Sequence, residues 1–358
     1  MGRLPQPGEA TMAHSAGLDV SDKETALHVV DGSGRIVWRG TRPSEPDALA
    51  SALRRHAPEL EHKGLEIGQL APWLYHSLRE LGLPVVCLDA RHARTATALQ
   101  RNKTDAHDAE TLAQLVRTGW YREARVKGWA AHLIRRLVGA RAQMVGISID
   151  LSNQIRSTLK TFGLRASGGA GRAFEAKVRT ALEGRPEVAG VIEPLLAAWR
   201  AVRDQIAALE KRLIKTAKED ATCRLLMTCP GVGVVVAASY AAAIEAPAHF
   251  PRSRSVGAYL GLTPRRYQSG EIDRNAGVSK RGDKLLRAYL FEAAAALLVR
   301  VQRGSALKVW GTGLVERLGF KRAAVAVARR VGVVLHAMWK AGKPFQAWPA
   351  ADTAPAAA

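Results

Sequence analysis

The sequence has few of the features that mark secreted and membrane proteins. Only three of its 358 residues are cysteines, at spacings that suit neither a disulfide framework nor a structural zinc site. No apolar run approaches the roughly 20 residues that cross a bilayer, and residues 1–15 lack a signal peptide's apolar core. We read residues 1–15 and the alanine-rich residues 346–358 as disordered, with Met1 or Met12 as the start. Cys87 stands in an apolar run, so we expect it in the core of a cytoplasmic protein with no membrane partner.

Acidic residues are scarce relative to basic ones. Lys and Arg number 53 against 32 Asp and Glu, a formal net charge of +21. This balance is the electrostatic footprint of a nucleic-acid binder, and an anionic membrane surface or an acidic protein partner are the alternatives. The phosphate-binding pattern Gly-x-x-x-x-Gly-Lys-Ser/Thr is missing as well, which is consistent with a reaction that does not use ATP.

Residues 16–126 alternate between strand and helix patterns. Three short strand-like runs come first, and the turn Asp-Gly-Ser-Gly at residues 31–34 predicts that the second and third form a hairpin. A helix, a short strand ending at Glu66, a second helix and a buried strand follow, before a helix that begins near Asp105. This order predicts an α/β domain with a ribonuclease-H-like nuclease fold, an inference about fold and not yet about function.

The remainder of the chain reads as mostly helical. Residues 127–220 carry apolar residues at helical spacing in two long segments, which predicts an antiparallel helical arm or coiled coil that serves dimerisation. Residues 221–345 form a further, mostly helical domain, with a basic, glycine-punctuated loop before its later helices. Within it Pro-Gly-Val-Gly at residues 230–233 fits either a phosphate-binding turn between helices or a plain packing turn.

Four acidic residues in the first domain form a set suited to divalent metal ions. Asp19 lies in the first strand and Glu66 at the end of the fourth, while Asp105 and Asp108 share one face of a helix's first turn. Carboxylate oxygens suit Mg²⁺ or Mn²⁺, and two such ions can stabilise the attacking and leaving oxygens of a phosphoryl transfer. A strand end or the helix macrodipole would explain each acid alone. Three nearby acids compete for the same role: Asp22, Asp89 and Glu110.

A second candidate site surrounds Ser269. A serine hydroxyl is a weak nucleophile unless a base or a metal activates it. Gly270 would let the backbone approach a phosphate, whose oxygens Arg265 and Arg266 could hold with two hydrogen bonds each. On these residues alone a turn serine before glycine is the commoner interpretation, and Ser279 is a rival nucleophile.

Four motifs occur in a distinctive order: Gly17-Leu-Asp-Val-Ser, Leu65-Glu-Ile-Gly, Asn102-Lys-Thr-Asp-Ala-His-Asp-Ala and Tyr267-Gln-Ser-Gly, with Cys229-Pro-Gly-Val-Gly before the last. This order resembles the DEDD transposases of bacterial insertion sequences, family one-ten, which are recombinases guided by a bridge RNA. The resemblance covers residues 16–345 and implies a RuvC-like N-terminal domain, a helical arm and a C-terminal transposase domain.

The resemblance also implies a chemistry. The four acids would bind Mg²⁺ or Mn²⁺, and Ser269 would form a covalent phosphoserine with cleaved DNA. A structured guide RNA from the element would pair with donor and target DNA, and a dimer, or a tetramer on DNA, would build a composite site across protomers at the nucleoid. Ile67 stands where the family often has a small or hydroxylated residue, but neighbouring strand residues point to opposite faces, so Glu66 keeps its place. The side chains expected to contact nucleic acid are Lys103, Arg265, Arg266, Lys280 and Arg281.

Two other hypotheses fit the same residues. A RuvC-type structure-selective endonuclease would use water as the nucleophile, so Ser269 would be structural and no covalent adduct would form. A nucleic-acid-binding protein without catalysis would carry the acids as structural groups. The abundance of Lys and Arg suits a protein that grips backbone while base pairing selects the sequence. The RNA-guided transposase is therefore the function that we expect.

Overall fold

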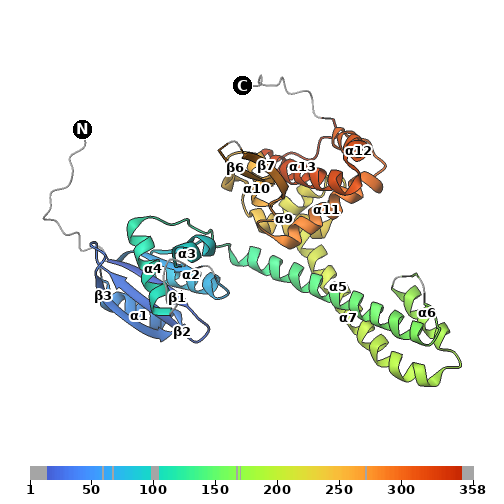
Figure 1. Cartoon of the computed structure of the whole chain (residues 1–358), viewed down its shortest axis with the longest axis horizontal. Coiled ribbons are helices and arrows are strands. Elements are labelled where there is room, and N and C mark those ends of the chain that lie inside the picture. Colours follow the sequence, from blue (N-terminus) through green and yellow to red (C-terminus); the bar gives the residue numbers. More distant parts are fainter. Residues whose placement is uncertain are drawn as a thin grey trace. The chain divides into compact units, whose positions relative to one another are not determined.

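The computed structural model describes residues 14–58, 60–66, 68–97, 105–166, 168–169, 171–270 and 272–348. The chain divides into two compact units, residues 1–127 and 128–358 (Figure 1). Across the described ranges, no helix is both long and apolar enough to cross a membrane.

A five-stranded sheet forms the centre of the first unit (Figure 1). The strand order is β3-β2-β1-β4-β5, in which β1 pairs antiparallel with β2 and parallel with β4. The pairs β2–β3 and β4–β5 are antiparallel and parallel, respectively. The mixed α/β fold and the three leading antiparallel strands that we predicted are confirmed. The strands are β1 (His14–Val20), β2 (Glu24–Val30), β3 (Ile36–Pro43), β4 (Leu60–Glu66) and β5 (Val85–Leu88).

Alternation along β1 divides the packing between the two faces of the sheet. Ala16 and Leu18 belong to a buried apolar cluster with residues of α1 (Pro46–His56) and α2 (Ala71–Glu80). Gly17, between them, faces the other way, toward α4 (Asp105–Thr118). Cys87 belongs to the first cluster and is fully buried, as expected.

The helix α3 (Ala90–Thr97) is an element that the sequence pattern did not indicate. Its residues are alanine, arginine, histidine and threonine, so it has no apolar side chain larger than alanine. The Asp89 carboxylate starts it, since Oδ1 accepts hydrogen bonds from the backbone N–H groups of Arg91 and His92 at 3.0 and 3.3 Å. Asp89, a competitor for the metal set, therefore acts as a helix cap.

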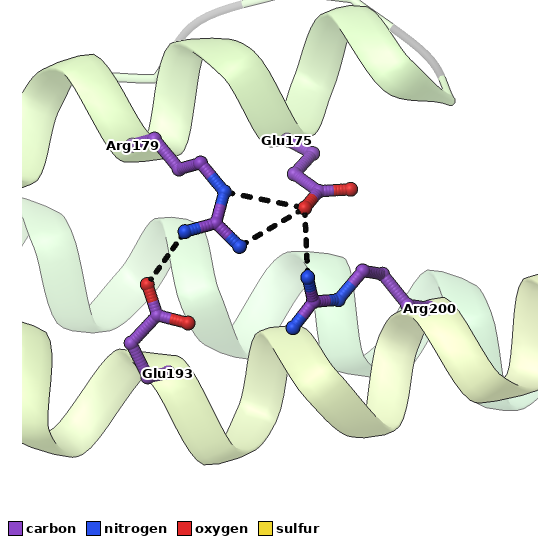
Figure 2. A network of polar contacts seen from close by, with 4 residues as sticks. All are labelled: Glu175, Arg179, Glu193 and Arg200. Atoms are coloured by element: carbon purple, nitrogen blue, oxygen red, sulfur yellow. Dashed lines mark hydrogen bonds and ion pairs between the residues drawn. The ribbon is translucent and has the colours of Figure 1, made fainter.

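The second unit opens with a helical arm (Figure 1). It contains α5 (Trp129–Thr161), α6 (Arg172–Leu182) and α7 (Pro186–Glu219). Ile155 packs with Ile192 near the tip, whereas Arg141 binds Glu210 at 2.6 Å further down, so α5 and α7 run antiparallel. Figure 2 shows the polar network that attaches α6 to α7: Glu175 contacts Arg179 and Arg200 at 3.1 and 3.2 Å, and Arg179 contacts Glu193 at 3.1 Å.

Helices build the core of the rest of the second unit. The buried helix α9 lies at its centre, and the Tyr240 hydroxyl donates a 2.6 Å hydrogen bond to the Gly332 carbonyl of α13. Gly231, in the turn before α9, lies against α11, where an added Cβ would be 2.4 Å from the Ala293 carbonyl oxygen, so this is a packing turn. The helices are α8 (Ala221–Leu226), α9 (Val234–Ile244), α10 (Val256–Tyr259), α11 (Lys284–Val299), α12 (Ala306–Leu318) and α13 (Phe320–Ala341), with 3₁₀ turns η1 (Pro247–His249) and η2 (Ser253–Ser255).

The predicted basic loop is in fact a β-hairpin. Strands β6 (Pro264–Ser269) and β7 (Ile272–Val278) pair antiparallel. Every residue of β6 is exposed, so this strand buries neither of its faces in a core. The alternation of apolar and polar residues that identifies a half-buried strand is consequently missing, and the sequence pattern could not indicate these strands.

Candidate functional site

Two of the four predicted metal ligands stand at the same end of neighbouring strands. In the parallel register of β1 and β4, Gly17 pairs with Gly64, and Asp19 and Glu66 come two residues after them. Residues two apart on a strand share a face, and adjacent strands lie about 4.8 Å apart. Both carboxylates therefore share the face, and the end of the sheet, to which the two glycines point.

Helix α4 covers that face because both glycines let it come close. A Cβ added to Gly17 would lie 2.0 Å from the carbonyl oxygen of Ala109, and one added to Gly64 would lie 2.2 Å from Val116 Cγ2. These contacts leave no room for any side chain. Asp19 and Glu66 thus lie on the face of the sheet that packs against α4, two residues beyond the two glycines.

The first turn of α4 extends toward the same end. Ser15, at the start of β1, lines a shallow pocket with residues 116–118 at the end of α4, so the helix runs antiparallel to β1. Asp108 and Asp105 lie four and seven residues before the buried Leu112, on its side of the helix. Asp108 is half-buried and Asp105 is exposed. All four acids accordingly lie toward one end of one face of the sheet.

His28 fixes this first turn, and the sequence analysis missed it. His28 lies on β2, opposite Gly17 of β1, and its side chain is 1 % exposed. Its Nδ1 lies 3.0 Å from the Ala106 carbonyl oxygen. A carbonyl oxygen only accepts, so Nδ1 carries the proton and donates. Burial lowers the pKa of the imidazole. Only the strand register reveals this role, because a histidine in a strand pattern gives no such signal.

The donor set fits a hard divalent cation. All four side chains offer carboxylate oxygens, the ligands that Mg²⁺ and Mn²⁺ prefer. Among the described residues, no three Asp, Glu, His or Cys side chains already lie close enough together to hold an ion. The backbone therefore brings the acids to one region, and the side chains would have to converge further to share a metal. Lys103, predicted to contact nucleic acid, lies outside the described residues.

Ser269 lies at the exposed tip of the β6–β7 hairpin. It is the last residue of β6, pairs with Ile272, and precedes Gly270, whose φ of +54° favours glycine in a tight turn. Among the described residues the Ser269 hydroxyl has no hydrogen-bond partner. The described part of the hairpin thus presents the hydroxyl without a base to activate it.

One of the predicted phosphate-binding arginines is already engaged. The Arg266 guanidinium donates to both carboxylate oxygens of Asp273, at 2.9 Å from Nε and 2.6 Å from a terminal nitrogen. This pairing raises the pKa of Arg266 and lowers that of Asp273. Arg265 is exposed on the opposite face of the strand.

The base of the hairpin is anchored by two close backbone contacts. A Cβ added to Gly261 would lie 1.8 Å from the Arg281 carbonyl oxygen, and one added to Gly282 would lie 2.2 Å from that of Tyr259. Lys280, which directly precedes Arg281, has a φ of +54°, which is unusual for a residue with a side chain. Such strain concentrates at functional sites, and Lys280 and Arg281 are both exposed there.

Family models match both parts of the chain. A model described as the transposase IS116/IS110/IS902 family matches residues 223–309, and a DEDD transposase model of the IS110 type matches residues 16–163. Both parts of the chain match models of transposases, and the protein is a transposase. As a transposase it cleaves and rejoins DNA, and a domain of the DEDD type implies the use of a divalent metal.

Curated relatives resemble the transposase along most of its length. It is 27% identical over 328 residues to the transposase for insertion sequence element IS1111A of Coxiella burnetii, covering 90% of this chain and 88% of the relative. A probable family 20 transposase of Pseudomonas aeruginosa is 27% identical, over 90% and 95% of the two chains. The transposase for IS1328 of Yersinia enterocolitica is 25% identical, over 77% and 82%.

The positive charge of the transposase lies almost wholly in its second unit. Residues 1–127 contain 17 Lys and Arg against 16 Asp and Glu, a net charge of +1. Residues 128–358 contain 36 against 16, a net charge of +20. The second unit therefore supplies nearly all of the field that attracts a polyanion.

Proposed function

We propose that this transposase breaks DNA by forming a covalent phosphoserine at Ser269, with Asp19, Glu66, Asp105 and Asp108 as the ligands of Mg²⁺ or Mn²⁺. The placement of the acids carries the proposal: two of them end adjacent parallel strands, on the face covered by the helix that bears the other two. The exposed position of Ser269 at the tip of the β6–β7 hairpin supports it from the other unit.

The bond changes of the proposed step balance. Ser269 Oγ forms one bond to phosphorus while one bond from phosphorus to a sugar oxygen breaks. The hydroxyl proton leaves Ser269, and the departing sugar oxygen takes up a proton. One phosphate ester replaces another, so strands can be rejoined without ATP. When bound, the divalent ion would supply neutralisation of the phosphate charge and activation of the nucleophile.

The strand order of the first unit supports a ribonuclease H or RuvC type of fold. Three antiparallel strands lead into parallel β4 and β5, and acids stand on β1, on β4 and on the late helix α4. These are the positions that the sequence analysis required of such a nuclease domain.

A composite site shared between protomers is part of the same proposal. The acids belong to one compact unit and Ser269 to the other, so one protomer can supply its serine to the acids of a second. Exposed apolar side chains on α5, Leu133 at 72% and Ile149 at 53%, support a role of the arm in a dimer or in a tetramer on DNA.

If a structured RNA guides the reaction, the basic second unit would bind the backbones of both the RNA and the DNA. Its net charge of +20 is suited to gripping the backbones of donor DNA, target DNA and RNA, while base pairing selects the sequence. The exposed Arg265, Lys280 and Arg281 around the hairpin are the proposed contacts.

Trapping the covalent intermediate tests the proposal. The transposase, copurified with RNA from its own element's flanking sequence, is supplied with donor and target DNA and Mg²⁺, and denaturant-resistant protein–DNA adducts are resolved on a gel. We expect an adduct that disappears with Ser269→Ala and with Asp105→Asn but persists with the matched control Ser279→Ala. Cleavage without an adduct would instead establish the hydrolytic nuclease, with water as the nucleophile.

A further inference from the structure

The two faces of the β6–β7 hairpin carry different side chains. Alternation along β6 places Arg265, Tyr267 and Ser269 on one face. The register adds Arg274, which pairs with Tyr267. We call this set the serine face; it comprises Arg265, Tyr267, Ser269 and Arg274.

The opposite face carries an ion pair between the two strands. Arg266 and Asp273 are diagonal neighbours there, joined by two hydrogen bonds of 2.9 and 2.6 Å. This exposed pair links the two strands across the face opposite Ser269. The serine face has no comparable part in the fold among the described residues.

Tyr267 is the unexplained residue of the serine face. Its side chain is 64% exposed, and among the described residues it makes no ring contact, no cation–π contact and no hydrogen bond. Leaving a large aromatic side chain in water forgoes the stability that its burial would give. It also lies two residues from Ser269, about 6.8 Å along an extended strand.

An exposed ring with one arginine two residues before it on its own strand and another directly across on the partner strand fits a nucleotide. Bases of any identity stack on an aromatic ring, and arginine side chains hold the flanking phosphates. The net charge of +20 on this unit favours the same polyanionic occupant over a protein surface.

We propose that Tyr267 stacks on the base next to the phosphate that Ser269 attacks, and that Arg265 and Arg274 hold the phosphates on either side. The inference rests on the proposed role of Ser269. Stacking would hold the strand against the serine face, so the scissile phosphate stays beside the hydroxyl. Tyr267 would therefore be a residue that positions the DNA and does not itself react.

The test combines variants of Tyr267 with DNA that lacks a single base. Adduct formation is timed with wild type, Tyr267→Ala, Tyr267→Phe and the control Gln268→Ala, which changes an exposed neighbour on the opposite face. Each protein receives intact DNA and DNA with an abasic nucleotide on one or the other side of the scissile phosphate.

On intact DNA we expect Tyr267→Ala to slow the adduct about 10- to 100-fold, the effect of losing one base–aromatic stack. Tyr267→Phe and Gln268→Ala should remain close to wild type. With one of the two abasic DNAs, wild type should slow to the rate of Tyr267→Ala, so that the variant no longer matters. A folding defect would instead slow the reaction equally on every DNA.

The stacking inference is overturned if Tyr267→Ala matches wild type on intact DNA, or slows intact and abasic DNA by the same factor, while Ser269→Ala still abolishes the adduct. An adduct that survives Ser269→Ala would refute the proposed nucleophile itself. The two failures are therefore distinguishable in one experiment.

Discussion

The imidazole of His28 holds the first turn of α4 through the backbone of Ala106. The distance from Nδ1 to the Ala106 carbonyl oxygen is 3.0 Å, and the histidine side chain is almost wholly buried. Ala106 lies directly after Asp105 in the first turn of α4. The contact from His28 on β2 therefore sets the position of the turn that carries two predicted metal ligands.

Removing this contact should weaken the metal dependence of cleavage. We predict that His28→Ala lowers the free energy of unfolding by about 1–3 kcal/mol, because the hydrogen bond to Ala106 is lost and a cavity forms where the buried imidazole stood. It should also raise the Mg²⁺ concentration that gives half-maximal adduct formation. His28→Asn, which keeps a donor, should restore part of the effect, and His107→Ala, on the exposed side of the same turn, should leave the Mg²⁺ titration close to wild type. An unchanged Mg²⁺ titration in His28→Ala would remove His28 from the account of the site.

The glycine at position 17 is required by the approach of α4. Gly17→Ala would bring Cβ to 2.0 Å from a backbone oxygen, which cannot move away as a flexible side chain could. We predict a loss of about 3 kcal/mol or more in unfolding free energy, at or beyond the upper end of the usual cost of overpacking. The control is Gly68→Ala, where nothing lies within 4 Å. Equal unfolding midpoints for the two variants in urea would contradict the close packing of α4 on β1.

A buried lysine limits the stability of the first unit. Lys63 on β4 is 1% exposed, and burial together with the charge of Arg54 lowers its pKa to about 8. The unfolded state therefore binds more protons between about pH 8 and the ordinary lysine value near 10.5, so stability rises with pH through this window. Near pH 7 the folded state carries a charge that burial disfavours.

Replacing that lysine should accordingly stabilise the protein. We predict that Lys63→Met raises the unfolding free energy at pH 7 by about 1–3 kcal/mol, given 1.36 kcal/mol for each pKa unit. The advantage should shrink as the pH rises toward 10, which urea titrations at several pH values would show. A destabilised variant, or a gain that does not depend on pH, would mean that the Lys63 charge is well solvated in the folded state.

The proposed composite site predicts complementation between inactive proteins. Ser269→Ala keeps the acids and Asp105→Asn keeps the serine, so a mixture of the two should form the adduct that neither forms alone. Tags of different size would show the DNA on the Asp105→Asn chain. A mixture as inactive as its components would place the serine and the acids of one site in the same protomer.

The sequence pattern predicted the elements whose apolar side chains pack into a core. The apolar runs of β1 and β2 and the apolar stripe of α4 are visible in the sequence, so these elements were correctly placed. The helix α3 has no apolar side chain larger than alanine and begins at the Asp89 cap, and every residue of β6 is exposed, so neither element has a clear apolar pattern.

Some residues of the candidate site could be proposed from the sequence, and others could not. The four acids could be proposed from the sequence because carboxylates near strand ends and on one helix face are visible there. The contributions of His28 and Gly17 depend on the register between strands and on where α4 crosses them, which no local pattern contains. Likewise, the pairing of Arg266 with Asp273 is a cross-strand contact of a hairpin that was not predicted.

The most direct test of the central claim is to locate the linked nucleotide by mass spectrometry. Trypsin cuts after Arg266, Arg274 and Lys280, so Ser269 and its rival Ser279 fall into separate peptides, residues 267–274 and 275–280. After the adduct is trapped and its DNA is digested with nuclease, we predict a nucleotide remnant on the peptide 267–274, attached at Ser269. A remnant on the peptide 275–280, or cleaved DNA with neither peptide modified, would contradict the assignment of Ser269 as the nucleophile.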